Sequence, residues 1–141
     1  MRHIPLLARL VLGFIFFASG LMGLFNLVPV PPNLPEKMQA FMAGIMATGY
    51  FLPFLKGTET VCGLLLLVGA FVPLALIVLA PIIINILLVH IFLAPDGLPV
   101  ALVIAALEIY LAFFASPYKE TVRQIFRCPM KESWCTKKAA N

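Results

Sequence analysis

Four long apolar stretches, separated by short polar or proline-rich connections, dominate the pattern of this chain. They cover residues 4–27, 51–70, 73–93 and 99–116. A helix needs about 20 mostly apolar residues to cross the hydrocarbon core of a bilayer. We therefore predict an all-α integral membrane protein, in which residues 1–116 form a transmembrane four-helix bundle and residues 117–141 form a tail. The first stretch is longer than the core of a signal peptide, which has about 7–15 residues, so we expect it to be retained.

The connections between the spans carry their own signals. Residues 29–35 are rich in proline, which lacks the backbone N–H and clashes with the preceding helical turn, so an extended linker is expected there. The next segment, residues 36–50, has apolar side chains at spacings of three and four: Met38, Phe41, Met42, Ile45 and Met46. This spacing predicts a short helix at the membrane interface. Pro-Asp-Gly at residues 95–97 predicts a turn between the last two spans.

Composition and charge support the membrane assignment. The 141 residues are 62% hydrophobic and 11% charged, whereas soluble domains have about 25% charged residues. A soluble enzyme, a disordered chain and a disulfide-rich secreted domain are therefore poor interpretations.

The net charge of +4 could suggest nucleic acid as a partner, but the basic residues gather at the two ends of the chain. These are Arg2, Arg9, Lys119, Arg123, Arg127, Lys131, Lys137 and Lys138. With four spans both ends lie on one side, and the positive-inside rule predicts that this side is the cytoplasm. We thus expect a multi-pass protein of the cytoplasmic (inner) membrane, and no nucleic acid partner. Tyr118, Val122 and Ile125 are at helical spacing, which predicts that the tail begins with a basic amphipathic helix.

Polar side chains inside the spans are the candidates for function, because a charged group there costs about 2.5–3.5 kcal/mol and usually faces the bundle interior. We single out Asn26, Lys56, Glu59, Asn85, His90 and Glu108. Lys56 and Glu59 share a helix face and can pair. If the six lie at similar depth, they would line a pocket that opens to the outer side and binds a small molecule, a quinone head group or protons. Glu59 and Glu108 could share a proton there if they are close.

A structural interpretation of the same residues stays open, because a Lys–Glu pair and an Asn also join helices in membranes. No metal site is predicted, since His90 is the one histidine within a span and a bis-histidine haem needs two. Arg9 is expected to extend to the lipid head groups, with a partner carboxylate as the alternative. Ser19 and Gly23 on the first span, and Ala101 and Ala105 on the fourth, favour close helix contacts.

The cysteines do not indicate a disulfide framework. Six residues separate Cys128 from Cys135, a spacing that matches no common zinc or redox motif. We interpret them as ordinary thiols of the tail, with a redox pair or a metal shared with a partner as alternatives. Cys62 is expected to be a small packing residue.

Several motifs in a fixed order are similar to those of the DoxX family, which comprises small bacterial four-helix membrane proteins. They are IPLLARL at residues 4–10, FMAGIMATGY at 41–50, LKGTE at 55–59, FVPLAL at 71–76 and APIIIN at 80–85, followed by His90. The resemblance covers about residues 4–116. It implies a four-helix bundle in the cytoplasmic membrane, and Arg9, Lys56, Glu59, Asn85 and His90 match recurrent polar positions of the family. The founding members are membrane subunits linked to thiosulfate:quinone oxidation, and others are thought to assist redox complexes.

We therefore expect a membrane accessory or anchor subunit of a respiratory or sulfur-oxidising redox complex. It would be a non-catalytic subunit of an oxidoreductase rather than an enzyme by itself, and quinone is the one cofactor considered. Its partners would be the lipid bilayer and either other membrane subunits or further copies of itself. Two alternatives remain open: an assembly or chaperone-type membrane protein with a purely structural polar cluster, and a small proton-coupled carrier.

Overall fold

The computed structural model describes residues 3–27 and 33–125. Within these ranges every regular element is a helix, and four helical segments are long and apolar enough to cross a membrane. They are α1 (His3–Leu24), α3 (Phe51–Val68), α4 (Val72–Phe92) and a composite of η1 (Pro95–Gly97), α5 (Leu98–Ile109) and η2 (Tyr110–Phe114). The prediction of an all-α protein with four spans is confirmed. Cys128 and Cys135 lie outside the described residues.

The helix boundaries follow from local backbone chemistry. The helix α3 ends at Gly69, whose φ of 82° is left-handed and whose N–H donates to the Leu65 carbonyl. Phe71 is also left-handed, and Pro73 occupies the first turn of α4, where its missing N–H costs nothing. The two helices thus form a tight hairpin. At the other end of the bundle Pro95 begins the short η1 turn, and Pro99 again lies in the first turn of the next helix.

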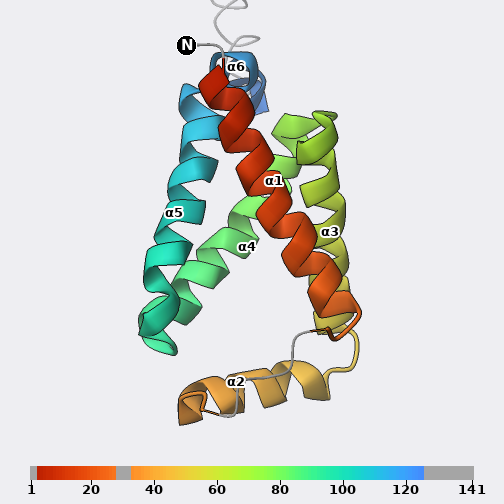
Figure 1. Ribbon diagram of the computed structural model, residues 1–141, viewed down its shortest axis with the longest axis vertical. Helices are drawn as coiled ribbons and strands as arrows, with labels where there is room; N and C mark the ends of the chain where they lie inside the picture. The colour runs from red at the N-terminus through yellow and green to blue at the C-terminus, as the bar shows by residue number, and fades with distance from the viewer. Residues whose placement is uncertain (1–2, 28–32, 126–141) are drawn as a thin grey trace, which may run out of the picture.

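Two further helices lie at opposite ends of the bundle (Figure 1). The helix α2 (Glu36–Ala47) runs across the end where α1 stops and α3 starts. The helix α6 (Ser116–Ile125) lies at the other end, beside the beginning of α1. A position of α2 at a membrane interface stays a prediction.

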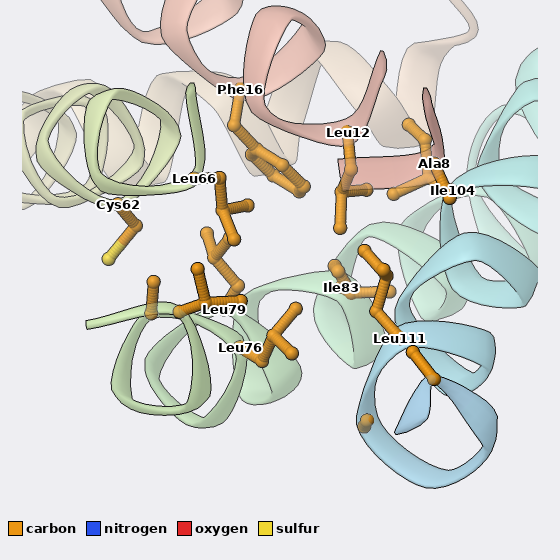
Figure 2. Close-up of a cluster of buried hydrophobic side chains, with 14 of the residues drawn as sticks. Ala8, Leu12, Phe16, Cys62, Leu66, Leu76, Leu79, Ile83, Ile104 and Leu111 are labelled. Atoms are coloured by element: carbon orange, nitrogen blue, oxygen red, sulfur yellow. The ribbon is translucent and has the colours of Figure 1, made fainter. Parts of the chain in front are cut away.

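The core lies where α1, α3, α4 and α5 face one another (Figure 2). Leu12 and Phe16 of α1, Leu66 of α3 and Leu79 of α4 are buried at its centre, and Leu111 of η2 extends it. Large apolar side chains cover the outer surface as well, among them Phe14, Val61, Leu74 and Val103. A protein that is apolar both inside and outside is suited to lipid rather than water as its solvent.

The spans do not pack equally. The helices α1 and α3 make the most extensive contact in the described structure and run side by side, whereas α4 crosses diagonally behind them towards α5. This arrangement decides which polar side chains meet.

Candidate functional site

An ion pair within α3 lies where that helix packs against α1. The ammonium Nζ of Lys56 lies 2.8 Å from Oε2 of Glu59, one turn further along α3, and Ser19 of α1 donates its hydroxyl proton to the same oxygen over 3.1 Å. Lys56 also donates to the Ser19 Oγ over 3.4 Å. Glu59 is only 2% exposed. The predicted pairing of Lys56 with Glu59 is therefore present, and Ser19, for which the small-residue spacing predicts only a helix contact, joins it as a third member.

Glycines of α1 give this cluster its room. A Cβ atom on Gly23 would lie 2.7 Å from Cγ of Lys56, so the aliphatic stem of that lysine rests directly on the glycine. A Cβ atom on Gly20 would lie 2.6 Å from the backbone nitrogen of Thr60. The hydroxyl of Thr60 donates back to the Lys56 carbonyl over 2.7 Å. Small residues that bring two backbones together are the usual means of helix contact in membranes. Ser19 and Gly23 thus contribute to contacts within the bundle.

The second buried carboxyl group, that of Glu108, has a different environment. Glu108 of α5 is 7% exposed, and its Oε2 has no hydrogen-bond partner among the described residues. It lines a cavity of about 260 Å³ between α4, α5, η2 and α6. The other lining side chains are all apolar: Leu76, Ile77, Ala80, Ile83, Ile84, Leu87, Ala105, Ile109, Ala112, Phe113 and Val122. One polar group therefore faces an otherwise apolar space.

The helix changes its pitch directly after Glu108. Residues Tyr110–Phe114 form the π-helical element η2, and the Ala115 N–H donates to the Tyr110 carbonyl five residues earlier. Single π-helical turns are rare in proteins, and those that occur are often found at functional sites. This turn also directs Ala112 and Phe113 into the wall of the Glu108 cavity.

The other predicted site residues lie elsewhere. Asn85 is exposed on α4 and lines a separate hollow of about 330 Å³ between α3 and α4. Nδ1 of His90 donates to the Ile86 carbonyl over 2.7 Å, and its ring packs on Gly97 in the η1 turn. Asn26 is exposed beyond the end of α1, in a left-handed conformation.

Of the six residues, the structure therefore brings together only Lys56 and Glu59. Within residues 3–27 and 33–125, Glu59 and Glu108 make no hydrogen bond to each other: Oε2 of Glu59 accepts from Lys56 and Ser19, and Oε2 of Glu108 has no partner. No group of three or more histidine, cysteine or acidic side chains with metal-binding geometry occurs in the same ranges.

Arg9 anchors the end of the bundle where the chain begins. Its Nη1 donates to the hydroxyl of Tyr118 on α6 over 3.5 Å, and its guanidinium packs against Gly69 at the α3–α4 hairpin. A cation next to the C-terminus of α3 is favoured by the helix dipole. No carboxylate within hydrogen-bonding distance of Arg9 occurs among the described residues. Arg9 thus connects three elements at this end.

Comparison with known proteins identifies one related family. The family model described as DoxX matches residues 4–94, a segment that includes Arg9, Lys56, Glu59, Asn85 and His90 but ends before Glu108. No curated protein and no solved structure matches the chain.

Proposed function

The chain belongs to the DoxX family, and from this premise we propose that it is a membrane accessory subunit of a respiratory or sulfur-oxidising redox complex that holds a quinone-class molecule beside Glu108. The membrane part of this statement is supported by four apolar spanning helices. The redox part extends what the family resemblance implies for its founding members.

The isolated carboxyl group of Glu108 carries the proposal. A quinone has an apolar ring and tail and presents only carbonyl or, when reduced, hydroxyl oxygens for hydrogen bonding. A carboxyl group can bind either form, because it accepts a hydrogen bond from a hydroxyl when ionised and donates one to a carbonyl when protonated. A buried polar group without a partner is costly. A bound head group would remove this cost at Glu108.

The cavity suits a ligand that arrives from the lipid. Its size, about 260 Å³, is close to the lower end of small-molecule sites, roughly 300–1,000 Å³. Ile84, Ile109 and Phe113 line it and are also exposed on the outer surface of the bundle. A ring could therefore lie against Glu108 while its tail stays in the bilayer.

The test is to count the quinone that stays with the purified protein. Membranes containing the host quinone are solubilised in mild detergent, and the quinone extracted from the purified chain is quantified per polypeptide. We expect about one quinone per chain in the wild type, since one carboxyl group faces one cavity. Glu108→Leu should lose it, and Ala105→Leu, which fills the cavity but keeps the carboxyl group, should lose it as well.

Two variants serve as controls. Glu108→Gln should retain part of the quinone, because an amide still donates and accepts hydrogen bonds, and Glu36→Gln on the exposed start of α2 should retain all of it. Wild-type protein that carries no quinone, or quinone that persists in both cavity variants, would contradict the proposal. Purification from native membranes without any redox partner would contradict the subunit role.

The Lys56–Glu59–Ser19 cluster favours a second candidate, an assembly protein whose polar residues only hold the bundle together. Its hydrogen bonds are made within the chain, one inside α3 and two between α1 and α3, as a structural role requires. In that case Glu59→Gln lowers the folding yield but leaves the turnover of each assembled partner complex unchanged. Under the first candidate Glu108→Leu lowers that turnover while the folding yield is kept.

A further inference from the structure

One face of α4 is uncovered along almost its whole length. Leu74, Val78, Leu88 and Phe92 are 55%, 36%, 47% and 70% exposed, and Pro81 and Asn85 on the same face are exposed as well. Their spacing of four, three, four, three and four residues is the 3.5-residue repeat of a coiled-coil seam. We call this set of six residues the α4 seam.

Asn85 is the one polar residue of the α4 seam. Within the four spans as described, and away from their ends, it is the one polar side chain that is exposed. Its carboxamide makes no hydrogen bond to the described residues, whereas Thr58, Thr60 and His90 each bond to a backbone carbonyl of their own helix. Lipid tails offer no partner, and an unsatisfied amide in hydrocarbon is costly.

The helix backbone one turn before Asn85 lacks one of its regular hydrogen-bond donors. Pro81 lies inside α4, and since proline has no N–H, the carbonyl oxygen of Ile77 receives no bond from it. In membrane helices such groups are usually satisfied by neighbouring helices. Both features indicate that this face of α4 is covered in the functional protein.

We propose that a second copy of the chain covers the α4 seam, so that two α4 helices cross near Asn85 and the two Asn85 carboxamides bond to each other. Copies of one chain insert in the same direction, so the two-fold axis of a dimer lies along the membrane normal. Each residue of α4 then faces the same residue of its partner at the same depth. A carboxamide is complementary to itself, because its NH₂ donates and its carbonyl accepts.

The surroundings of the seam fit this occupant. A 3.5-residue repeat gives two helices a left-handed crossing of about 20°, and one Asn in such a seam fixes the register and the number of helices. The hollow between α3 and α4, about 330 Å³, is lined by Val78, Pro81 and Asn85 on one side and by Phe54 and Leu55 on the other. Side chains of the partner helix could enter it next to Asn85.

Cysteine crosslinking in native membranes tests the contact directly. In a background of Cys62→Ala, Cys128→Ser and Cys135→Ser, the variant Leu88→Cys places a thiol on the α4 seam. Leu102→Cys places one on the outer face of α5, where the leucine is 54% exposed. Leu88→Cys should form a disulfide-linked dimer on mild oxidation, and Leu102→Cys should not. Equal crosslinking at both positions, or crosslinking of Leu88→Cys only to another protein, would overturn the proposal.

A second measurement isolates the role of Asn85 itself. The dimer dissociation constant is measured for the purified, fluorescently labelled chain in bilayers of decreasing protein density. Asn85→Leu should raise this constant about 5- to 30-fold, the range expected for hydrogen bonds between transmembrane helices in model peptides, while Asn85→Gln should raise it less. A wild type that is monomeric at every density, or an unchanged constant in Asn85→Leu, would refute the pairing. If Asn85→Leu does not fold, the crosslinking result decides.

Discussion

Two buried glutamates, Glu59 on α3 and Glu108 on α5, differ in whether their Oε2 atoms have hydrogen-bond partners. Glu59 has Lys56 and Ser19, whereas the Oε2 of Glu108 has none among the described residues. A satisfied carboxylate connects helices, and an unsatisfied one is available to a ligand. The proposed function therefore rests on Glu108, although in the sequence both residues are single glutamates within apolar spans.

Removing one member of the ion pair should cost far more than removing both. Lys56→Met leaves the carboxylate of Glu59 buried with only a hydroxyl partner, and breaking such a pair costs about 3–5 kcal/mol. The double variant Lys56→Met/Glu59→Leu should regain most of this free energy of unfolding, because no unpaired charge remains. Unfolding in mixed detergent micelles measures all three proteins, with Lys37→Met on the exposed surface of α2 as control. A single variant as stable as the control would contradict this role.

At the residue level the sequence predicted one part of the site. The spacing of Lys56 and Glu59 on one helix predicted their pairing, because residues three apart on a helix are always neighbours. The isolation of Glu108 depends on how α4, α5 and α6 pack, and no local spacing encodes that. The hydrogen bond from Ser19 to Glu59 was not predicted either, because the two residues lie forty positions apart and meet only through the packing of α1 on α3.

At the level of elements, α1 and α3 pack so closely at their glycines that the facing helix leaves no room for a methyl group there. A Cβ atom on Gly20 would reach the backbone of Thr60, and one on Gly63 would reach that of Phe17. Gly20→Ala should therefore lower the free energy of unfolding by about 1–3 kcal/mol through overpacking. Gly57→Ala is the matched control, because nothing lies within 4 Å of its added Cβ atom. It should raise stability by about 0.5–1 kcal/mol through helix propensity.

Thermal unfolding in detergent compares these glycine variants. The expected order of melting temperature is Gly57→Ala above the wild type, and Gly20→Ala below it. A Gly20→Ala protein as stable as the Gly57→Ala protein would show that α1 and α3 can separate without cost. The close packing of α1 on α3 would then not be what holds Ser19 beside Lys56 and Glu59.

The helices were predictable where the length of an apolar run and the positions of prolines determine their boundaries. The four spans lie close to their predicted ranges, because a 20-residue apolar run has few alternatives. The π-helical element η2 was not predicted, since residues 110–114 are as apolar as the rest of the span. This element packs against α4 and α6, and a one-dimensional pattern does not contain such packing.

At the scale of the whole molecule, the arrangement of helices separates the polar residues that the sequence placed at similar depth. The position of a residue along an apolar run gives its depth but not which helices are neighbours. Because α1 pairs closely with α3 while α4 crosses towards α5, Glu59 and Glu108 belong to different helix pairs. The ion pair and the cavity are therefore two sites, which mutations can address separately.

The two ends of the molecule also differ in charge, and this difference predicts its orientation. Arg9, Lys119 and Arg123 lie at the end formed by the start of α1 and by α6, whereas α2 at the opposite end carries Glu36 and Lys37, whose charges cancel. The positive-inside rule predicts that the basic end lies in the cytoplasm. In a background of Cys62→Ala, Cys128→Ser and Cys135→Ser, Lys37→Cys should react with a membrane-impermeant maleimide on intact cells. Lys119→Cys should react only after the membrane is permeabilised. The reverse pattern of labelling would show that the predicted topology is wrong. The end at which α6 lines the Glu108 cavity would then face away from the cytoplasm.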